Sequence, residues 1–293
     1  MTRGLITIAT GNKYYYELAK NLLISYRLKS ANPLPFAIIA EEENEYTELF
    51  DDVILTTEAK RSFLDKFLLL KLCPYDETIF CDADILAYGD LNKYWELFQG
   101  ATDFSSLGEN CGLYENRAWY NKEDIWKYGN SIEYKCRVHM GVCFIRKSDT
   151  LMKLYYDCLD IVNNYDKLMI SKHRDSVDEV AIAIAMPMNQ MQAVDEHSEM
   201  MVTVPCATSL DADIYTGRLS YTTQWGKTVK ENSLLIHFGT IHTKAPLYRF
   251  EVRSINYLLK KKMGKGTALQ NAYYSSKLRR IFLKISQWIY KIF

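Results

Sequence analysis

Two aspartates at the end of an apolar run are the residues of this sequence best suited to metal chemistry. Asp82 and Asp84 follow residues 78–81, a short apolar run typical of a buried strand. Alternate side chains of an extended chain share one face, and carboxylates held that close repel each other unless a cation joins them. Mg²⁺ and Mn²⁺ prefer oxygen ligands and often link carboxylates to phosphates. The pattern predicts a metal site, with an ordinary strand-to-turn junction as the alternative.

The same Asp-Ala-Asp spacing occurs a second time. Asp211 and Asp213 flank an alanine, but polar residues precede them in place of an apolar strand, and Gly217 follows soon after. Residues of this kind favour turns and loops. We therefore expect a surface loop here, without a metal.

The elements that must position the first pair alternate between strand-like and helix-like patterns. Strands are predicted at residues 5–9, 35–40, 52–55, 78–81, 104–107, 138–145, 201–204 and 234–238. Helices are predicted at residues 14–29, 62–72, 90–98, 151–162 and 177–185, and a long loop or lid at residues 110–135. This alternation predicts an α/β fold with a mainly parallel sheet flanked by helices. Such sheets bind ligands beyond the carboxyl ends of their strands.

The composition argues against several classes of protein. The formal net charge of zero disfavours general attraction to nucleic acid. The seven cysteines are odd in number and lack a Cys-x-x-Cys spacing, which disfavours a disulfide framework or a zinc site and indicates a reducing compartment. The sequence shows no signal-peptide pattern and no apolar stretch of about 18 residues. We expect a cytoplasmic protein.

The C-terminal region has a charge pattern of its own. Residues 252–293 contain seven Lys and three Arg without one Asp or Glu, so this region carries +10 and the rest of the chain −10. On a helix over residues 277–293, one apolar stripe comprises Leu278, Ile281, Phe282, Ile285, Trp288, Ile289 and Ile292. The opposite face holds Lys277, Arg280, Lys284, Gln287 and Lys291. We expect a domain at residues 1–250 and a basic amphipathic tail at residues 251–293. The tail would lie on an anionic membrane, with packing on the core as the alternative.

At this point the chain resembles the family 8 glycosyltransferases, which include glycogenin and bacterial lipooligosaccharide galactosyltransferases. Residues 80–86 resemble the family's Asp-x-Asp strand end, and residues 236–248 resemble its His-Phe-x-Gly-x-x-Lys-Pro-Trp segment. Three further segments match in order, at residues 8–14, 66–75 and 140–145. The resemblance implies a GT-A (Rossmann-like) fold, Mn²⁺ (or Mg²⁺) and a nucleotide-sugar donor, UDP-linked in many members, with retention of configuration.

The resemblance also assigns roles to individual residues. The metal ligands would be Asp82, Asp84 and His237. The donor contacts would be Thr10, Asn12, Tyr14, Lys66, Ala83, Gly239 and Lys244, with Lys244 on the diphosphate. Asp178 and Glu179 stand where the family has an Asp-Gln pair beside the reacting sugar.

The chain departs from the family pattern at several of these positions. His139 replaces the Asn of an Asn-x-Gly-Val strand, and Glu179 replaces the Gln. In the His-Phe segment, Gly239 comes one residue early, Lys244 one residue late, and Tyr248 stands near the expected Trp. His237 therefore matches the pattern more closely than Lys244 does.

The sequence thus predicts a metal-dependent hexosyltransferase acting on a glycan or lipid-linked acceptor, peripheral on the inner face of a membrane. Two other classes stay open. A haloacid-dehalogenase-like phosphatase also uses Asp-x-Asp after a strand, but it needs Thr soon after the second acid, where this chain has Ile85 and Leu86. A non-catalytic carbohydrate- or lipid-binding protein is the other, although Asp82, Asp84 and His237 are all present.

Overall fold

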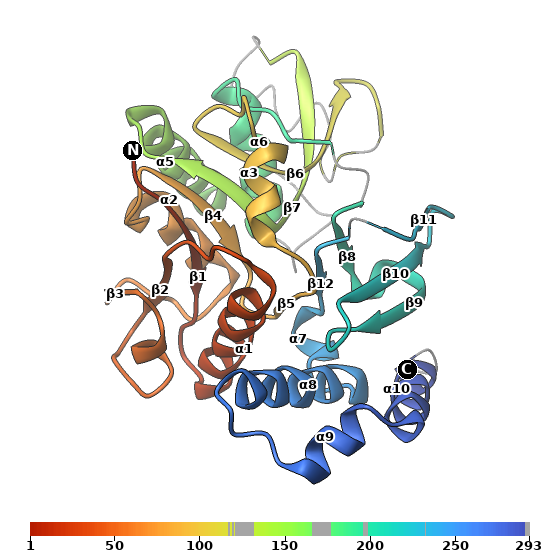
Figure 1. Cartoon of the computed structure of the whole chain (residues 1–293). Helices are drawn as coiled ribbons and strands as arrows, with labels where there is room; N and C mark the ends of the chain where they lie inside the picture. Colours follow the sequence, from red (N-terminus) through yellow and green to blue (C-terminus); the bar gives the residue numbers. More distant parts are fainter. Residues whose placement is uncertain are drawn as a thin grey trace. The chain divides into compact units, whose positions relative to one another are not determined.

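The computed structural model describes residues 1–116, 118, 120, 132–165, 177–195, 199–231 and 233–290, with the backbone alone at 290. The chain divides into two compact units, whose elements are labelled in Figure 1. The first consists of Met1–Tyr16, Leu34–Asp82 and Lys93–His197, and the second of Glu17–Pro33, Ala83–Asn92 and Ser198–Phe293. Helix α1 (Lys13–Lys29) begins in the first unit and continues in the second.

The first unit is built on a six-stranded sheet. Its strands are β1 (Arg3–Ile8), β2 (Phe36–Ala40), β3 (Asp52–Leu55), β4 (Glu77–Cys81), β6 (Phe104–Gly112) and β7 (Tyr134–Arg146). Their order is β3-β2-β1-β4-β7-β6. The first four are parallel, and β7 is antiparallel to both of its neighbours, so β6 runs in the direction of the parallel four. The mainly parallel sheet is confirmed.

Helices cover one face of this sheet. They are α2 (Leu68–Leu72), preceded by a 3₁₀ helix at Phe63–Phe67, α5 (Asp149–Asn163) and α6 (Val177–Met188). The side chains of Ile6, Ala37, Phe80 and Cys143 share one face of four neighbouring strands and join these helices in one buried cluster. Short α3 (Tyr94–Leu97) packs through Trp95 against Phe144, with ring centroids 6.3 Å apart.

The structure corrects the loop expected at residues 110–135. Strand β6 extends to Gly112 and β7 begins at Tyr134, and the two pair in register from Leu107 with His139 to Gly112 with Tyr134. The predicted loop therefore loses residues at both ends to a long hairpin. Residues 117, 119 and 121–131 lie outside the described residues.

The second unit contains two three-stranded sheets. In one, β12 (Leu235–His237) lies between β5 (Ile85–Ala87), to which it is antiparallel, and β8 (Met201–Thr203), to which it is parallel. In the other, β10 (Arg218–Thr223) lies antiparallel between β9 (Ala207–Asp213) and β11 (Thr228–Val229). The surface loop expected at residues 211–213 is wrong, because these residues end strand β9.

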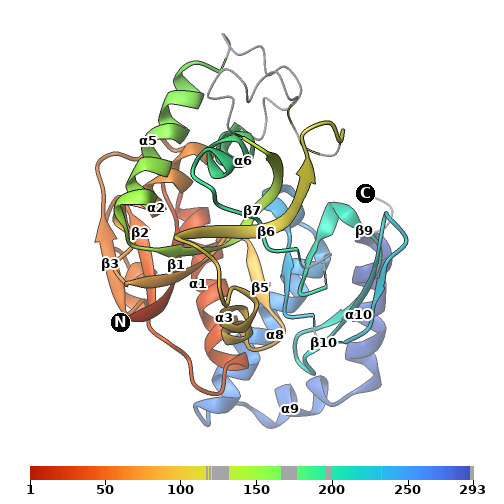
Figure 2. The same cartoon turned by 90° about the horizontal axis from the view of Figure 1, so that it is seen from above.

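Helices α7 (Gly239–His242), α8 (Pro246–Lys262), α9 (Ala268–Tyr274) and α10 (Lys277–Tyr290) complete the second unit. Pro246 opens α8, where its missing N–H costs nothing. Helix α10 packs on α8 and β9, and Figure 2 shows β9 and β10 beside it. The domain boundary expected at residue 250 lies inside α8. Among the described residues, no helix is long and apolar enough to cross a membrane.

Candidate metal and donor site

Strand β4 fixes the position of Asp82. Ile79, Phe80 and Cys81 of this strand are fully buried, and the backbone N–H of Asp82 donates to the carbonyl oxygen of Gly141 at 2.9 Å. This bond extends the β4–β7 ladder by one residue. The carboxylate therefore leaves the sheet at the carboxyl end of a central strand, where ligands of such sheets bind.

A lysine with only 12% of its side chain exposed links two of the predicted site residues in the first unit. The Nζ of Lys66 lies 2.8 Å from Oδ2 of Asp82 and 3.5 Å from Oδ2 of Asp178. Burial by itself would lower the pKa of Lys66, but the two carboxylates outweigh it and the pKa is raised. The pKa of Asp178 is raised, chiefly by burial, while Lys66 opposes the shift. The single ammonium group of Lys66 thus contacts two carboxylates, and little of these three side chains is exposed to water.

Asp178 and Glu179 lie in the first turn of α6, where acidic side chains interact favourably with the helix dipole. Oε1 of Glu179 accepts the backbone N–H of Met140 at 3.1 Å, so this side chain holds strand β7. His139, in the position of the family's Asn, accepts the N–H of Gly141 at its own Nδ1 at 3.1 Å. Both residues that depart from the family pattern here shape the same stretch of β7.

The predicted nucleotide-binding turn follows β1. The Thr10 hydroxyl donates to Oδ2 of Asp65 at 2.7 Å, and the Asn12 side chain accepts the N–H of Tyr14 at 2.9 Å. Asp65 also accepts the backbone N–H groups of Lys60 and Arg61 at 2.7 and 2.9 Å. We did not identify Asp65 from the sequence. Asp65 lies within a helical sequence pattern, and nothing in that pattern indicates that its side chain links this turn to the segment before α2.

In the second unit, the β5–β12 ladder brings Asp84 and His237 together. His237 pairs with Ile85 in the ladder, and the N–H of Phe238 donates to the carbonyl oxygen of Asp84 at 3.2 Å. Nε2 of His237 lies 2.9 Å from Oδ1 of Asp84, with 12% and 9% of the side chains exposed. Two ligands at right angles on a cation, each about 2.1 Å from it, are about 3 Å apart. The separation therefore suits neighbouring ligands of one Mg²⁺ or Mn²⁺.

Asp82 completes this group, because only Ala83 separates it from Asp84. The ligand atoms of Asp82, Asp84 and His237 all lie within 4.8 Å of one another. Within the part of the chain that the structure describes, no other group of three His, Cys, Asp or Glu side chains is arranged to hold an ion. One imidazole nitrogen and carboxylate oxygens form a donor set that fits Mn²⁺ or Mg²⁺.

The remaining predicted donor contacts, Ala83, Gly239 and Lys244, lie close to the three predicted metal ligands in the sequence. Ala83 is buried, and Gly239 opens α7 with φ at +68°, a conformation that favours glycine. Lys244 follows α7 and is exposed, while burial lowers the pKa of the nearby His242. Tyr248, near the position of the family's Trp, packs edge-on against Phe238 at 4.9 Å between ring centroids. Binding of a donor by these residues stays a prediction.

The comparisons with known proteins identify no family. No protein-family model matches the sequence, and no curated protein matches it. Among solved structures, the chain is similar to the glycosyltransferase GlyE of Streptococcus pneumoniae TIGR4, with a TM-score of 0.45 and 11% identity over 69% of this chain and 48% of that one. The apo form of GlyE gives a TM-score of 0.43 and 10% identity, over 70% of this chain and 47% of that one. This chain thus spans about half the length of these proteins, and a likeness at this level does not identify a reaction.

Proposed function

We propose that this chain is a metal-dependent glycosyltransferase that moves a hexose from a nucleotide-diphosphate sugar, UDP-linked, to a glycan or lipid-linked acceptor with retention of configuration. The observation that supports it most is the group formed by Asp82, Asp84 and His237, with ligand atoms within 4.8 Å. This group follows a buried central strand of a mainly parallel sheet, the place where α/β sheets bind ligands.

Each residue of the site has a part in this proposal. When bound, Mn²⁺ or Mg²⁺ supplies a Lewis acid for the diphosphate leaving group. Lys244, exposed after α7, adds a mobile positive charge for the same diphosphate. Lys66 lies within 2.8 Å of Asp82 and 3.5 Å of Asp178, so its positive charge offsets the negative charges of both carboxylates. Asp178 then accepts hydrogen bonds from hydroxyl groups of the donor sugar.

The turn after β1 would hold the nucleoside. Thr10 and Asn12 already shape this turn through Asp65 and the N–H of Tyr14. A turn that is ordered before the ligand arrives loses little conformational freedom on binding. In this proposal Tyr14 contacts the nucleoside, while Ala83 and Gly239 leave room for the donor to approach the backbone.

The basic C-terminal region would bring the enzyme to its acceptor. No acidic residue occurs at residues 252–293. Several large apolar side chains of α10 are about half exposed or more, such as Ile281 at 53% and Trp288 at 64%. A helix with an apolar row beside basic residues binds anionic membrane surfaces. We place the enzyme at the inner face of a membrane, where a lipid-linked acceptor is at hand.

Binding of UDP and UDP-sugars, with and without Mn²⁺, tests the reaction class. A ligand at about a hundred times its dissociation constant stabilises the folded state by about 2.7 kcal/mol, so a Mn²⁺-dependent rise in melting temperature is expected. Mn²⁺-dependent hydrolysis of the sugar nucleotide should accompany it. Lys244→Ala should lower turnover, because it removes a positive charge from the leaving diphosphate. His242→Ala, a change two residues earlier, is its control and should retain most turnover. A protein that no nucleotide sugar stabilises with Mn²⁺ contradicts the proposal.

A further inference from the structure

One row of side chains on helix α10 faces the rest of the second unit, and the amphipathic pattern of the sequence does not predict it. Arg279 and Leu283 are each only 2% exposed, and Nε2 of Gln287 donates to the carbonyl oxygen of Ala212 at 2.7 Å. These residues are spaced by four, so they share one face of the helix. That face belongs neither to the apolar stripe nor wholly to the basic side, and it attaches α10 to β9.

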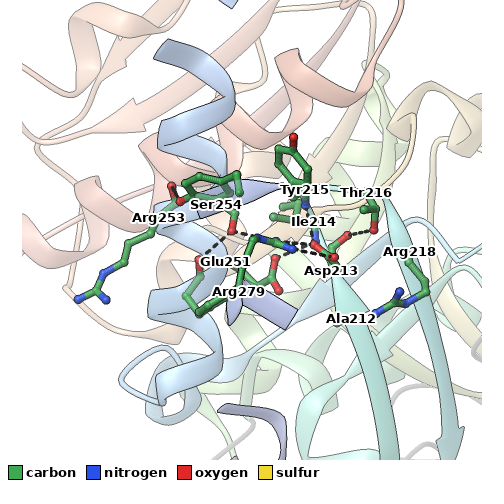
Figure 3. A network of polar contacts seen from close by, with 12 residues as sticks. Ala212, Asp213, Ile214, Tyr215, Thr216, Arg218, Glu251, Arg253, Ser254 and Arg279 are labelled. Carbon is green, nitrogen blue, oxygen red and sulfur yellow. Dashed lines mark hydrogen bonds and ion pairs between the residues drawn. The ribbon is translucent and has the colours of Figure 1, made fainter. Parts of the chain in front are cut away.

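Arg279 makes the strongest of these contacts. Its Nη1 and Nη2 donate to the two carboxylate oxygens of Asp213 at 3.0 and 2.6 Å, and Nη2 also reaches Oγ of Ser254 at 3.3 Å (Figure 3). The guanidinium carbon lies 4.9 Å from the ring centre of Tyr215. Side chains of Arg279 and Asp213 are 2% and 3% exposed. A bidentate pair in this geometry fixes both direction and rotation of the helix.

With that face turned inward, the apolar row of α10 points outward. Its large exposed side chains are Leu278 at 54%, Ile281 at 53%, Phe282 at 47%, Ile285 at 45% and Trp288 at 64%. Exposed Lys277, Arg280 and Lys284 belong to the same helix. Contiguous exposed apolar surface marks a binding surface. Lys291 and Ile292, expected to extend the two faces, lie outside the described residues.

The positive charge around the exposed apolar row favours an anionic membrane as its binding partner. Basic residues accompany the row and no acid occurs from Val252 onward, so a second copy of this surface would be repelled. An anionic bilayer offers both an apolar interior for the row and negative head groups for the lysines and Arg280.

We propose that Asp213 and Arg279 form a clamp that holds α10 against β9, so that the lipid-binding surface is a preformed part of the folded second unit and not a detached tail. This inference rests on the proposed binding of the C-terminal region to an anionic membrane. A helix already formed and oriented does not have to fold on the lipid, which favours binding. Adjacent arginines then have opposite tasks: Arg279 faces the protein and Arg280 faces the lipid.

Hydrogen exchange of the α10 amides in the full chain tests the clamp without lipid. In the wild-type protein these amides should be protected in solution. Asp213→Asn should speed their exchange by at least about tenfold, because local opening no longer has to break the ion pair. Asp211→Asn is the matched control, since Asp211 lies two residues away in β9 and pairs with Arg218 at the surface, 2.9 Å between Oδ1 and Nη2. Unprotected α10 amides in the wild-type protein overturn the clamp, even if the variant does not fold.

Co-sedimentation with vesicles tests the consequence, with phosphatidylglycerol and phosphatidylcholine in equal parts against phosphatidylcholine alone. Wild type and Asp211→Asn should pellet with the anionic vesicles alone, and Asp213→Asn should bind about tenfold more weakly. Phe282→Ser should lose binding with α10 still protected. If Asp213→Asn exposes α10 yet binds like wild type, a preformed surface is not needed and the inference fails. A wild-type protein that is protected but does not pellet instead contradicts the membrane proposal on which the inference rests.

Discussion

Glu251 should make the stability of this protein fall as the pH rises. The side chain is fully buried in α8 beneath α10, and Oε2 accepts the N–H of Ile214 at 2.8 Å (Figure 3). Among the described residues, its Oε1 has no hydrogen-bond partner. Burial raises the pKa of Glu251 from 4.5 to about 8, and Asp213 adds to the shift, while the Ile214 N–H, Arg279 and Lys29 oppose it.

The sign follows from proton binding. Between pH 4.5 and about 8 the folded protein keeps a proton on Glu251 that the unfolded chain has released, so the free energy of unfolding decreases as the pH rises through this window. Below pH 4.5 this contribution is fully present, and above pH 8 it is lost. Each unit of pKa is worth about 1.36 kcal/mol, so the loss across the window is on the order of 5 kcal/mol.

Urea unfolding of wild type and Glu251→Gln, at intervals from about pH 5 to about pH 9, measures this effect. The variant keeps the shape and the acceptor for Ile214 but cannot ionise. Its stability relative to wild type should therefore increase by several kcal/mol between the two ends of the range. Asp211→Asn removes an exposed acid of the same unit and should give a curve nearly parallel to that of wild type. Parallel curves for wild type and Glu251→Gln would show that Glu251 is ionised in the folded protein, and the reasoning would be refuted.

Three further predictions concern the candidate site. Asp84→Asn should weaken Mn²⁺-dependent UDP binding by at least about a hundredfold with an unchanged melting temperature, whereas Asp211→Asn should bind normally by calorimetry. Lys66→Met should reduce the free energy of unfolding by about 3–5 kcal/mol, since it leaves the buried carboxylate of Asp178 and the partly buried one of Asp82 without their cation. Adding Asp178→Asn should restore part of this loss, and a fully stable single variant would contradict the pairing. Lys244→Ala should lower turnover about a hundredfold through loss of a charge on the leaving diphosphate, and normal kinetics would mean that the segment is wrongly aligned.

The fold of the first unit was largely predictable because its signals are local. Strands β2 and β3 are short apolar or β-branched runs, and their predicted bounds agree with the observed ones within a residue. Helix α5 begins where Ser148 accepts the N–H of Leu151, as a capping residue should. The position of Asp82 could then be predicted, because it directly follows the apolar strand β4.

The second unit was harder to predict, and β9 shows why. Leu210 and Ala212 are buried while Asp211 between them is exposed, so the period of a strand is present. The polar composition of the segment, however, favoured a loop. The sequence could not predict which residue pairs with Asp213. Arg279 lies 66 residues away in the chain, and nothing in the neighbouring sequence distinguishes it from Arg280.

The two Asp-Ala-Asp triplets have the same spacing but differ in the group that faces their second carboxylate. Asp84 faces His237, and a neutral imidazole offers a lone pair from Nε2 to the same ion that the carboxylate binds. Asp213 faces Arg279, whose guanidinium stays charged and has no lone pair to offer. A cation at Asp213 would have to displace a buried bidentate partner and leave Arg279 without its counter-ion, which is costly. The same Asp-Ala-Asp pattern therefore has two different uses. After β4 it serves the proposed metal chemistry, and at the end of β9 it holds a helix in place.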